Sequence, residues 1–335
     1  MIGRIGVEAR RYVGAALVDG FFNAASRMGR LHPKSKPHRH AVEHLTDIPY
    51  LGTDRKEHLL DVYRPVHPTF ASPPPFRRFK GPPWPIVFYI HGGGFRILSK
   101  DTHWIMGLSF ARRGFIVFNV SYRLAPKHRY PAAIEDVCRA FAWVAANAER
   151  YGGDTSRLVV AGESAGANLA TSLAVALAYE RPEPFAKKAF ATGIVPKAVL
   201  PACGVFQVSD MHRLKRRKPG MSSFIADRLL EVEHAYLGRG PHACSLDLAD
   251  PLHVFERGDK PARALPPFFL PVGTKDPLLP DTRRMAVALR GLGVEAEEAY
   301  YPGEMHAFHA VVMREPARRC WNDTFAFLDR HVRDT

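Results

Sequence analysis

The chain has 335 residues, which suits one large α/β domain with a sizeable core and an appended lid or cap. Its 46% apolar and 24% charged residues are ordinary for a globular protein, and no apolar run reaches the roughly 18 to 20 residues that span a bilayer. The four cysteines are far apart, so neither a disulfide framework nor a C-x-x-C zinc site is expected. With an N-terminal stretch too charged for a signal peptide, this predicts a cytoplasmic location.

The net charge of +14 could indicate an anionic partner, such as a membrane surface or a nucleic acid. The basic residues are spread along the chain, however, with local clusters at 34–40, 77–80 and 213–218. Aromatic residues do not alternate with them as they do in nucleic-acid-binding modules. We therefore predict a solvated basic surface and no nucleic-acid partner.

Residues 1–31 are predicted to form a helix, because their apolar side chains fall roughly on one face. Such a helix could cover a pocket, dock on the surface for stability alone, or make a weak peripheral contact with a membrane. The basic, proline-containing stretch 31–40 is typical of a linker. We assign residues 1–45 to an N-terminal helical cap segment and linker. A homodimer is also compatible with the sequence.

Further along the chain, buried strands alternate with amphipathic helices. The predicted strands are 42–49, 57–63, 84–90, 115–120, 157–161, 196–203, 267–273 and 294–300. The predicted helices are 105–112, 132–150, 167–174, 224–237, 281–292 and 316–330. This order predicts a mainly parallel sheet with helices on both faces. We assign residues 46–335 to this domain, with an insertion at about 205–262 over the carboxyl edge of the sheet.

The stretch Gly162-Glu163-Ser164-Ala165-Gly166 lies between the apolar run 158–161 and the helical segment 167–174. A serine on a sharp turn between a strand and a helix is the context of a nucleophile elbow. The turn explains Gly162 and Gly166, because a side chain at either position would collide with the neighbouring strand or helix. Ser164 is therefore a candidate nucleophile, and a serine nucleophile needs an adjacent base.

The base and its orienting acid are expected later in the chain, in the order serine, acid, histidine. His306 lies in a loop just past a predicted strand. It is favoured over His309, which could support the site or lie at the surface. Asp276 follows another predicted strand and is favoured over Asp281, which suits the N-cap of the next helix. An aspartate before a proline can also simply open a turn.

The run Gly92-Gly93-Gly94 directly follows a predicted buried strand. Glycines can turn their backbone amides toward a site, because no Cβ stands in the way. We expect Gly93 and Gly94, together with the amide of Ala165, to donate hydrogen bonds to a developing oxyanion. His91 precedes the nucleophile in the chain and is predicted to shape this loop rather than to act as the base.

Five ordered motifs resemble the hormone-sensitive-lipase-like group of α/β-hydrolase carboxylesterases and lipases. They are His91-Gly92-Gly93-Gly94-Phe95, the segments 122–126 and 130–136, the pentapeptide 162–166, Asp276-Pro277-Leu278, and His306-Ala307-Phe308. The resemblance implies an α/β-hydrolase fold with a helical cap. It also implies a carboxylic-ester hydrolase with Ser164 as nucleophile, His306 as base and Asp276 as the orienter of the base. A capped pocket of this group implies short- to medium-chain esters, hydrolysed through an acyl-enzyme.

Three positions depart from the pattern of this group. Lys127 stands where Glu is common, Glu163 where Asp is usual, and Ala167 where Gly is frequent. None belongs to the expected triad, so these departures leave the rate and the pocket shape open rather than the class of reaction. Glu163 receives no assigned role from the sequence.

No cofactor or metal is expected, because the sequence has no H-E-x-x-H spacing and no G-x-G-x-x-G or Walker loop after a strand. The expected partner is a small-molecule ester. The same residues could instead serve an amide, a lactone or an acetylated sugar. A non-catalytic ligand receptor on the same fold is a further alternative, against which the intact Ser164, Asp276 and His306 argue.

Overall fold

The protein folds around one eight-stranded sheet in this computed structural model, which describes residues 19–20, 23–24, 26–66, 81–238 and 244–332. The strands lie in the order β1-β2-β4-β3-β5-β6-β7-β8. The pairs β1–β2 and β2–β4 are antiparallel, and the other neighbouring pairs are parallel. The strands are β1 (Val42–Pro49), β2 (Leu59–Pro65), β3 (Trp84–Ile90), β4 (Ile116–Val120), β5 (Gly153–Glu163), β6 (Ala198–Ala202), β7 (Phe268–Gly273) and β8 (Ala296–Tyr301).

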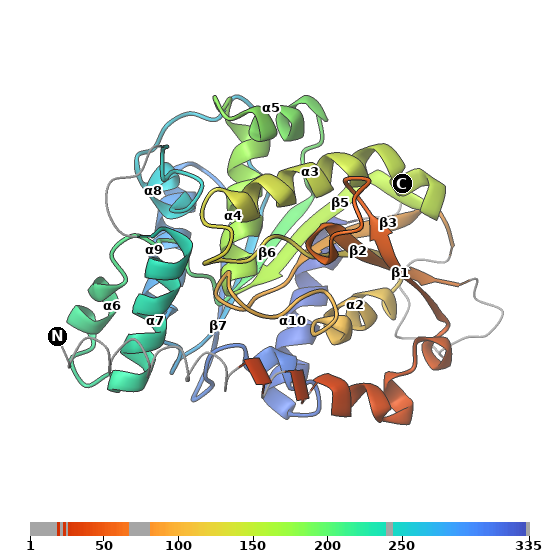
Figure 1. The fold of residues 1–335 in the computed structure, drawn as a ribbon, viewed down its shortest axis with the longest axis horizontal. Helices are drawn as coiled ribbons and strands as arrows, with labels where there is room; N and C mark the ends of the chain where they lie inside the picture. The colour runs from red at the N-terminus through yellow and green to blue at the C-terminus, as the bar shows by residue number, and fades with distance from the viewer. Residues whose placement is uncertain (1–18, 21–22, 25, 67–80, 239–243, 333–335) are drawn as a thin grey trace.

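Helices cover both faces of the sheet (Figure 1): α3, α4 and α9 pack on one face, and α2 and α10 on the other. This confirms the predicted α/β architecture with a mainly parallel sheet. The helices are α2 (Trp104–Ala111), α3 (Ala132–Asn147), α4 (Ala165–Ala178), α5 (Pro184–Ala191), α6 (His212–Arg217), α7 (Ser223–Tyr236), α8 (Pro251–Glu256), α9 (Leu279–Gly291) and α10 (Glu315–His331). Short 3-10 turns are η1 (Pro33–Ser35), η2 (Pro37–His40), η3 (Lys56–His58), η5 (Ala148–Tyr151) and η6 (Phe308–Ala310).

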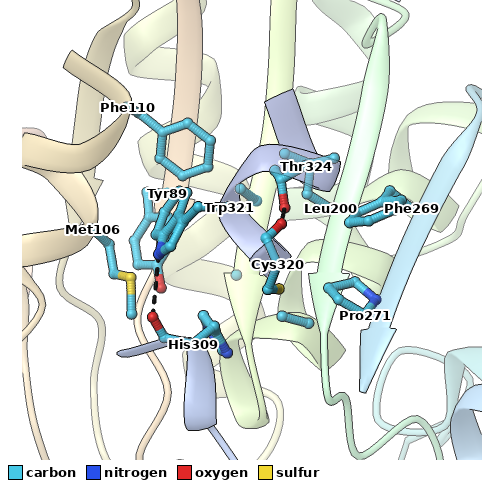
Figure 2. A pocket seen from close by; sticks show the side chains of 13 residues that line it. Tyr89, Met106, Phe110, Leu200, Phe269, Pro271, His309, Cys320, Trp321 and Thr324 are labelled. Carbon is cyan, nitrogen blue, oxygen red and sulfur yellow. Dashed lines mark hydrogen bonds between the residues drawn. The ribbon is translucent and has the colours of Figure 1, made fainter. Parts of the chain in front are cut away.

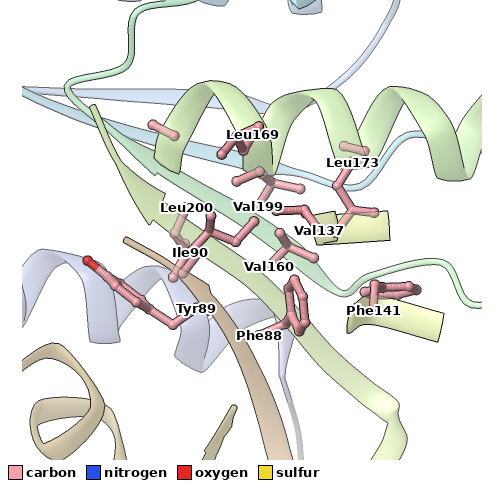
Figure 3. Packing of buried hydrophobic residues seen from close by; sticks show 14 of the residues in the cluster. Phe88, Tyr89, Ile90, Val137, Phe141, Val160, Leu169, Leu173, Val199 and Leu200 are labelled. Atoms are coloured by element: carbon pink, nitrogen blue, oxygen red, sulfur yellow. The ribbon is translucent and has the colours of Figure 1, made fainter. Parts of the chain in front are cut away.

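The core is built where the central strands meet α3 and α4 (Figure 3). All 7 residues of β3 and all 14 residues of α4 are buried. A strand that is apolar along its whole length is typical of a parallel sheet covered on both faces. Phe88 of β3 meets Phe141 of α3 edge-on, with ring centroids 5.5 Å apart. Burying one such ring stabilises the fold by roughly 1.5–3 kcal/mol. The turn between β5 and α4 adjoins this core, because β5 pairs with β3 and α4 is buried along its whole length.

Several features differ from the predictions made from the sequence. The strand predicted at 157–161 is longer, because β5 begins at Gly153. The strand predicted at 42–49 is confirmed as β1, so the sheet begins before the domain boundary that was expected between residues 45 and 46. Helices α5, α6 and α8 were not predicted; α6 and α8 have only 6 residues each, which are too few to show a helical period. Most of the predicted helix 1–31 lies outside the described residues, and residues 26–31 are helical.

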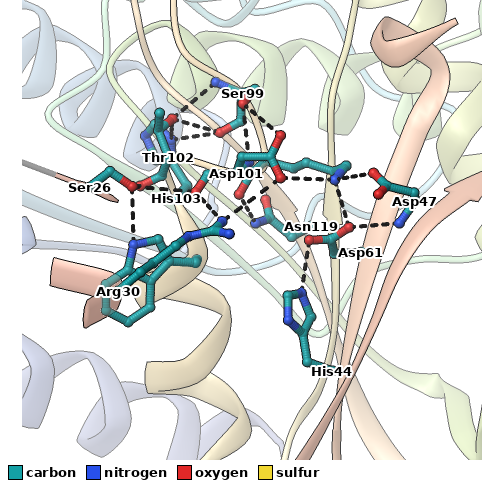
Figure 4. A network of polar contacts seen from close by, with 12 residues as sticks. Ser26, Arg30, His44, Asp47, Asp61, Ser99, Asp101, Thr102, His103 and Asn119 are labelled. Atoms are coloured by element: carbon teal, nitrogen blue, oxygen red, sulfur yellow. Dashed lines mark hydrogen bonds and ion pairs between the residues drawn. The ribbon is translucent and has the colours of Figure 1, made fainter. Parts of the chain in front are cut away.

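A buried lysine, Lys100, fixes the loop that follows the glycine run; its partners Asp47, Asp61 and Asn119 are labelled in Figure 4. Nζ of Lys100 lies 2.8 Å from Oδ1 of Asp61 on β2 and 2.7 Å from Oδ1 of Asp47 on β1. Burial opposes the charge on this side chain, but the carboxylates outweigh it and raise the pKa of Lys100 above its ordinary value. Asn119 on β4 also donates to the carbonyl of Lys100 at 3.0 Å. The loop is therefore tied to three strands of the sheet.

The stretch between β6 and β7 carries α6, α7 and α8. In Figure 1, α6 and α7 stand at one end of the sheet, apart from α3. This stretch interrupts the alternation of strands and helices, which was the reason to expect an insertion here. In the part of the chain that the structure describes, no helix combines the length and the apolar character needed to cross a membrane.

Candidate active site

Three of the predicted site residues meet at the carboxyl ends of parallel strands: Ser164 follows β5, Asp276 follows β7 and His306 follows β8. Nε2 of His306 lies 2.9 Å from Oγ of Ser164, and Nδ1 of His306 lies 2.8 Å from Oδ2 of Asp276. The other carboxylate oxygen of Asp276 accepts the amide of Leu278 at 2.8 Å, which holds the carboxylate in place. The side chains thus form the chain of hydroxyl, imidazole and carboxylate that can activate a serine.

The backbone at Ser164 is strained, with φ 54° and ψ −115°, a region that residues other than glycine rarely adopt. A Cβ on Gly162 would lie 2.4 Å from the carbonyl oxygen of Gly166. A Cβ on Gly166 would lie 2.1 Å from the carbonyl oxygen of Ile90, at the end of β3. Both contacts involve backbone atoms, which cannot move aside as a side chain can. These distances give the physical reason for glycine on both sides of the turn.

Ser164 lines a mainly apolar cavity of about 390 Å³, which we call the site cavity. Gly93 and Gly94 line the same cavity with φ values of +110° and +59°. A Cβ on Gly93 would lie 2.1 Å from the carbonyl oxygen of Ile97, so this turn requires glycine. Ala165 opens α4, and an amide in the first turn of a helix has no partner within the helix. The predicted oxyanion donors therefore all belong to segments that adjoin Ser164.

The imidazole of His306 is set up to accept a proton. Its side chain is 34% exposed, whereas that of Asp276 is fully buried. Burial opposes a charge on the ring, but the carboxylate of Asp276 outweighs it, and the pKa of His306 stands well above its ordinary value. Cys203, which follows β6, also lies beside the ring; burial raises the pKa of this thiol. No motif indicated Cys203 in advance, because its place beside His306 depends on the order of the strands.

Glu163 joins two histidines beside the elbow. Its Oε1 lies 2.8 Å from Nε2 of His103, and its Oε2 lies 2.9 Å from Nε2 of His309. Burial opposes ionisation of this carboxyl, but the two imidazoles outweigh it and hold the pKa of Glu163 well below its ordinary value. His309, the alternative to His306 in the sequence, is thus engaged by Glu163. The sequence analysis did not predict His103 as a residue of the site. Its position shortly after the glycine run was the one signal that could have indicated this.

Asp281 does not cap α9, so the N-cap interpretation of this residue was wrong. The helix begins at Leu279, and Asp281 lies fully buried in its first turn. Its Oδ2 lies 2.5 Å from Nη2 of Arg213 and accepts two backbone amides of the chain after β6 at 3.1 and 3.3 Å. Sequence spacing could not reveal this pair, because Arg213 comes from the insertion. The carboxylate beside the candidate base is that of Asp276.

His91 lies buried beneath the glycine loop. Its ring stacks on Tyr122 with the centroids 4.2 Å apart, and the hydroxyl of Tyr122 donates to the carbonyl of His91 at 2.9 Å. Burial lowers the pKa of His91 to about 3, so the ring is neutral near pH 7. This arrangement suits the loop-shaping role expected of His91.

A much smaller cavity lies behind the elbow (Figure 2). It measures about 30 Å³ and has largely apolar walls that include Tyr89, Phe110 and Trp321. Nε1 of Trp321 donates to the carbonyl of His309 at 3.1 Å, which links α10 to the η6 turn beside this cavity. Such a space holds no more than about two water molecules. This cavity is therefore too small to hold an ester substrate.

A comparison with known protein families identifies the family to which the chain belongs. The family described as having the alpha/beta hydrolase fold matches residues 87–310, a stretch that includes Gly93, Ser164, Asp276 and His306. The chain therefore belongs to the α/β-hydrolase family.

Individual relatives within this family are esterases. Esterase LipQ of Mycobacterium tuberculosis is 30% identical over 334 residues, which cover 92% of this chain and 72% of LipQ. Carboxylesterase NlhH of the same organism is 32% identical over 237 residues, covering 70% of this chain and 69% of NlhH. The resemblance to the hormone-sensitive-lipase-like esterases is confirmed.

Solved structures agree with this assignment. An esterase of Pyrobaculum calidifontis superimposes with a TM-score of 0.68 at 26% identity, covering 94% of this chain and 92% of the esterase. A bacterial heroin esterase shares the fold, with a TM-score of 0.71 at 23% identity and coverage of 94% of this chain and 91% of that protein.

Proposed function

We propose that this protein, a carboxylic-ester hydrolase of the α/β-hydrolase family, is a serine carboxylesterase that hydrolyses short- to medium-chain esters through an acyl-enzyme. The observation that carries the proposal is the hydrogen-bonded chain from Ser164 through His306 to Asp276. Support for the size of the substrate comes from the site cavity, whose volume of about 390 Å³ suits a small organic molecule.

In this proposal, Oγ of Ser164 attacks the ester carbonyl while Nε2 of His306 takes its proton. Asp276 stabilises the imidazolium that forms. The amides of Gly93, Gly94 and Ala165 stabilise the negative charge on the carbonyl oxygen. His306 then protonates the leaving alcohol. Water, deprotonated by His306, attacks the acyl-enzyme and releases the acid.

We also propose that the N-terminal segment and the insertion at about 205–262 form a cap over the site cavity. Three apolar side chains of α7, Ile225, Leu229 and Val232, line that cavity. At the end of the N-terminal segment, Arg30 donates to the carbonyl of Asp101 in the loop after the glycine run. The insertion thus contributes to the cavity wall, and the N-terminal segment contacts the loop beside it, which supports their assignment as a cap.

Covalent labelling tests the proposed nucleophile. We expect a fluorophosphonate to modify the protein at one residue, Ser164, because only a serine activated by a neighbouring base attacks such a reagent quickly. Mass spectrometry of the peptides would locate the adduct. Ser164→Ala should abolish the labelling, and Ser156→Ala, at an exposed serine near the start of β5, should leave it intact. Labelling that persists in Ser164→Ala contradicts the proposal, and so does a folded wild type that takes up no reagent.

The pH dependence tests the proposed base. An imidazolium cannot accept the proton of Ser164, so kcat/KM should rise with pH as His306 loses its own proton. Since the pKa of His306 stands well above 6.5, this rise should be centred above pH 6.5 in the free enzyme. In Asp276→Asn, the residual activity should show the same rise at lower pH, because the imidazolium has lost its stabilising carboxylate. A rise centred below pH 6.5 in the wild type contradicts the assignment.

A further inference from the structure

The carboxylate of Glu163 lies beside the nucleophile, although it takes no part in the proposed steps. Glu163 is the last residue of β5, directly before Ser164, and its side chain lines the site cavity with 9% of its surface exposed. Burial opposes its ionisation, but the imidazoles of His103 and His309 hold the pKa of this carboxyl well below its ordinary value, so the group is charged near pH 7. A buried charge is costly, so its place one residue from Ser164 needs a reason.

One carboxylate oxygen fixes the glycine loop. Oε1 of Glu163 lies 2.8 Å from Nε2 of His103, and the backbone nitrogen of Gly92 lies 3.3 Å from the same ring atom. Gly92 also packs directly on Glu163, because a Cβ added there would lie 3.0 Å from the carbonyl oxygen of Glu163 and 3.1 Å from its Cγ. Nδ1 of His103 lies 3.2 Å from the carbonyl oxygen of Ser99, so the ring is held on both sides (Figure 4). The first residue of the glycine run is thus fixed against the elbow, next to the expected oxyanion donors.

The other carboxylate oxygen fixes the loop of the base. Oε2 of Glu163 lies 2.9 Å from Nε2 of His309, which belongs to η6 and closely follows His306 in the chain. The carbonyl of His309 accepts Nε1 of Trp321 on α10 at 3.1 Å, so this residue is held from two directions (Figure 2). The imidazole of His306 itself is 34% exposed, so its position depends on Asp276 and on the backbone that carries it.

We infer that Glu163 is a positioning residue for ester hydrolysis: through His103 and His309, its two oxygens hold the glycine loop and the loop of the base in place beside Ser164. The inference rests on the proposed esterase function and adds to it a residue that acts through its neighbours. A displacement of about 1 Å between reacting groups can lower a rate by about 10²-fold. A side chain that links three parts of the site therefore has a large effect on the rate.

The charge of Glu163 makes the sign of the test informative. A carboxylate next to Ser164 repels the negative charge that develops on the carbonyl oxygen of the ester during the reaction. If this repulsion were its main effect, removing the charge would speed the reaction. If positioning is its main effect, the same change slows the reaction, because a neutral amide holds an imidazole less strongly than a carboxylate does. The two effects thus give opposite changes in Glu163→Gln, which keeps the size of the side chain.

We expect Glu163→Gln to lower kcat on a p-nitrophenyl ester by about 10- to 100-fold, with KM changed by less than about twofold. An aliphatic trifluoromethyl ketone, which forms a tetrahedral adduct with an activated serine, should bind more weakly by about the factor by which kcat/KM falls. A purely structural role would lower the free energy of unfolding in urea and leave the kinetic values of the folded protein unchanged. The matched control is Asp154→Asn, which removes a carboxylate from its pair with Arg157 near the opposite end of β5 and should leave kcat unchanged.

Variants of the two histidines test whether Glu163 acts through them. His103→Asn and His309→Asn should each lower kcat by about fivefold or more, far less than the loss of His306 does. The double variants Glu163→Gln/His103→Asn and Glu163→Gln/His309→Asn should be no more than about twofold slower than Glu163→Gln alone, because each removes a partner whose contact is already weakened.

The outcomes separate the inference from the proposed function. A folded Glu163→Gln whose kcat equals or exceeds that of the wild type overturns the inference, and so do a loss confined to KM and losses that multiply in the double variants. If Glu163→Gln does not fold, His103→Asn and His309→Asn, which keep the carboxylate, decide the matter. Wild-type kcat in both then overturns the inference, and a lowered kcat with unchanged KM supports it. A folded wild type that hydrolyses no ester counts against the proposed esterase function, and the inference falls with it.

Discussion

Alanine in place of Ser164 should lower kcat by about 10⁴- to 10⁶-fold for every ester the wild type hydrolyses, the scale of losing the nucleophile of a serine hydrolase. The reason is that, in the proposed mechanism, Oγ of Ser164 forms the covalent bond of the acyl-enzyme, and nothing else in the hydrogen-bonded chain can replace it. His306→Ala should cost a similar factor, because the hydroxyl is a weak nucleophile without a base 2.9 Å away.

The double variant Ser164→Ala/His306→Ala is the sharper measurement. Since both residues serve one step, we expect it to be nearly as active as either single variant, far above the product of the two losses. Initial rates on a p-nitrophenyl ester, with each preparation checked for traces of wild type by fluorophosphonate titration, would give the three values. Losses that multiply in the double variant would show that Ser164 and His306 do not act on the same step. His309→Asn is the matched control for a histidine beside the site, because His309 contacts Glu163 and not Ser164. The loss of activity in this variant should be much smaller than in His306→Ala.

The parts of the site that the sequence predicted share one property: each is encoded within a short stretch of chain. The elbow at Ser164 shows its strand, its glycines and its helix within a few residues of one another. Ser164, Asp276 and His306 each follow a predicted strand. Because the carboxyl ends of parallel strands meet at one edge of the sheet, these three residues could be expected to lie close together. The sheet itself was predictable for the same reason, since runs such as 84–90 are apolar without interruption.

What the sequence did not show depends on contacts between distant segments. The partners of Glu163 come from the loop after β3 and from the turn after β8, so nothing near Glu163 in the chain predicts them. Arg96 meets Glu231 because α7 packs over the glycine loop, and a charged residue in a surface-like helical pattern looks solvated until that packing is known. The N-cap prediction for Asp281 was wrong for the same reason: its carboxylate binds Arg213, which comes from the distant insertion, instead of capping the helix beside it.

A methyl group added at Gly166 should destabilise the protein by about 3 kcal/mol or more, at the upper end of what overpacking costs. The new Cβ would lie 2.1 Å from the carbonyl oxygen of Ile90 and 2.5 Å from that of His91, both at the carboxyl end of the central strand β3. Relief of these contacts requires the start of α4 to move away from β3. That movement would displace Ser164 from the glycine loop, so activity should fall together with the free energy of unfolding.

The matched control is the same substitution at Gly291, in the last turn of α9, where a Cβ would meet no atom within 4 Å. Because alanine restricts the unfolded chain and favours helix, Gly291→Ala should be neutral or stabilise the protein by up to about 1 kcal/mol. Urea unfolding followed by circular dichroism would measure both variants against the wild type. If the free energies of unfolding of Gly166→Ala and Gly291→Ala differ by less than about 1 kcal/mol, the close contact between α4 and β3 does not limit the choice of residue at this turn. The steric reason given for Gly166 is then wrong.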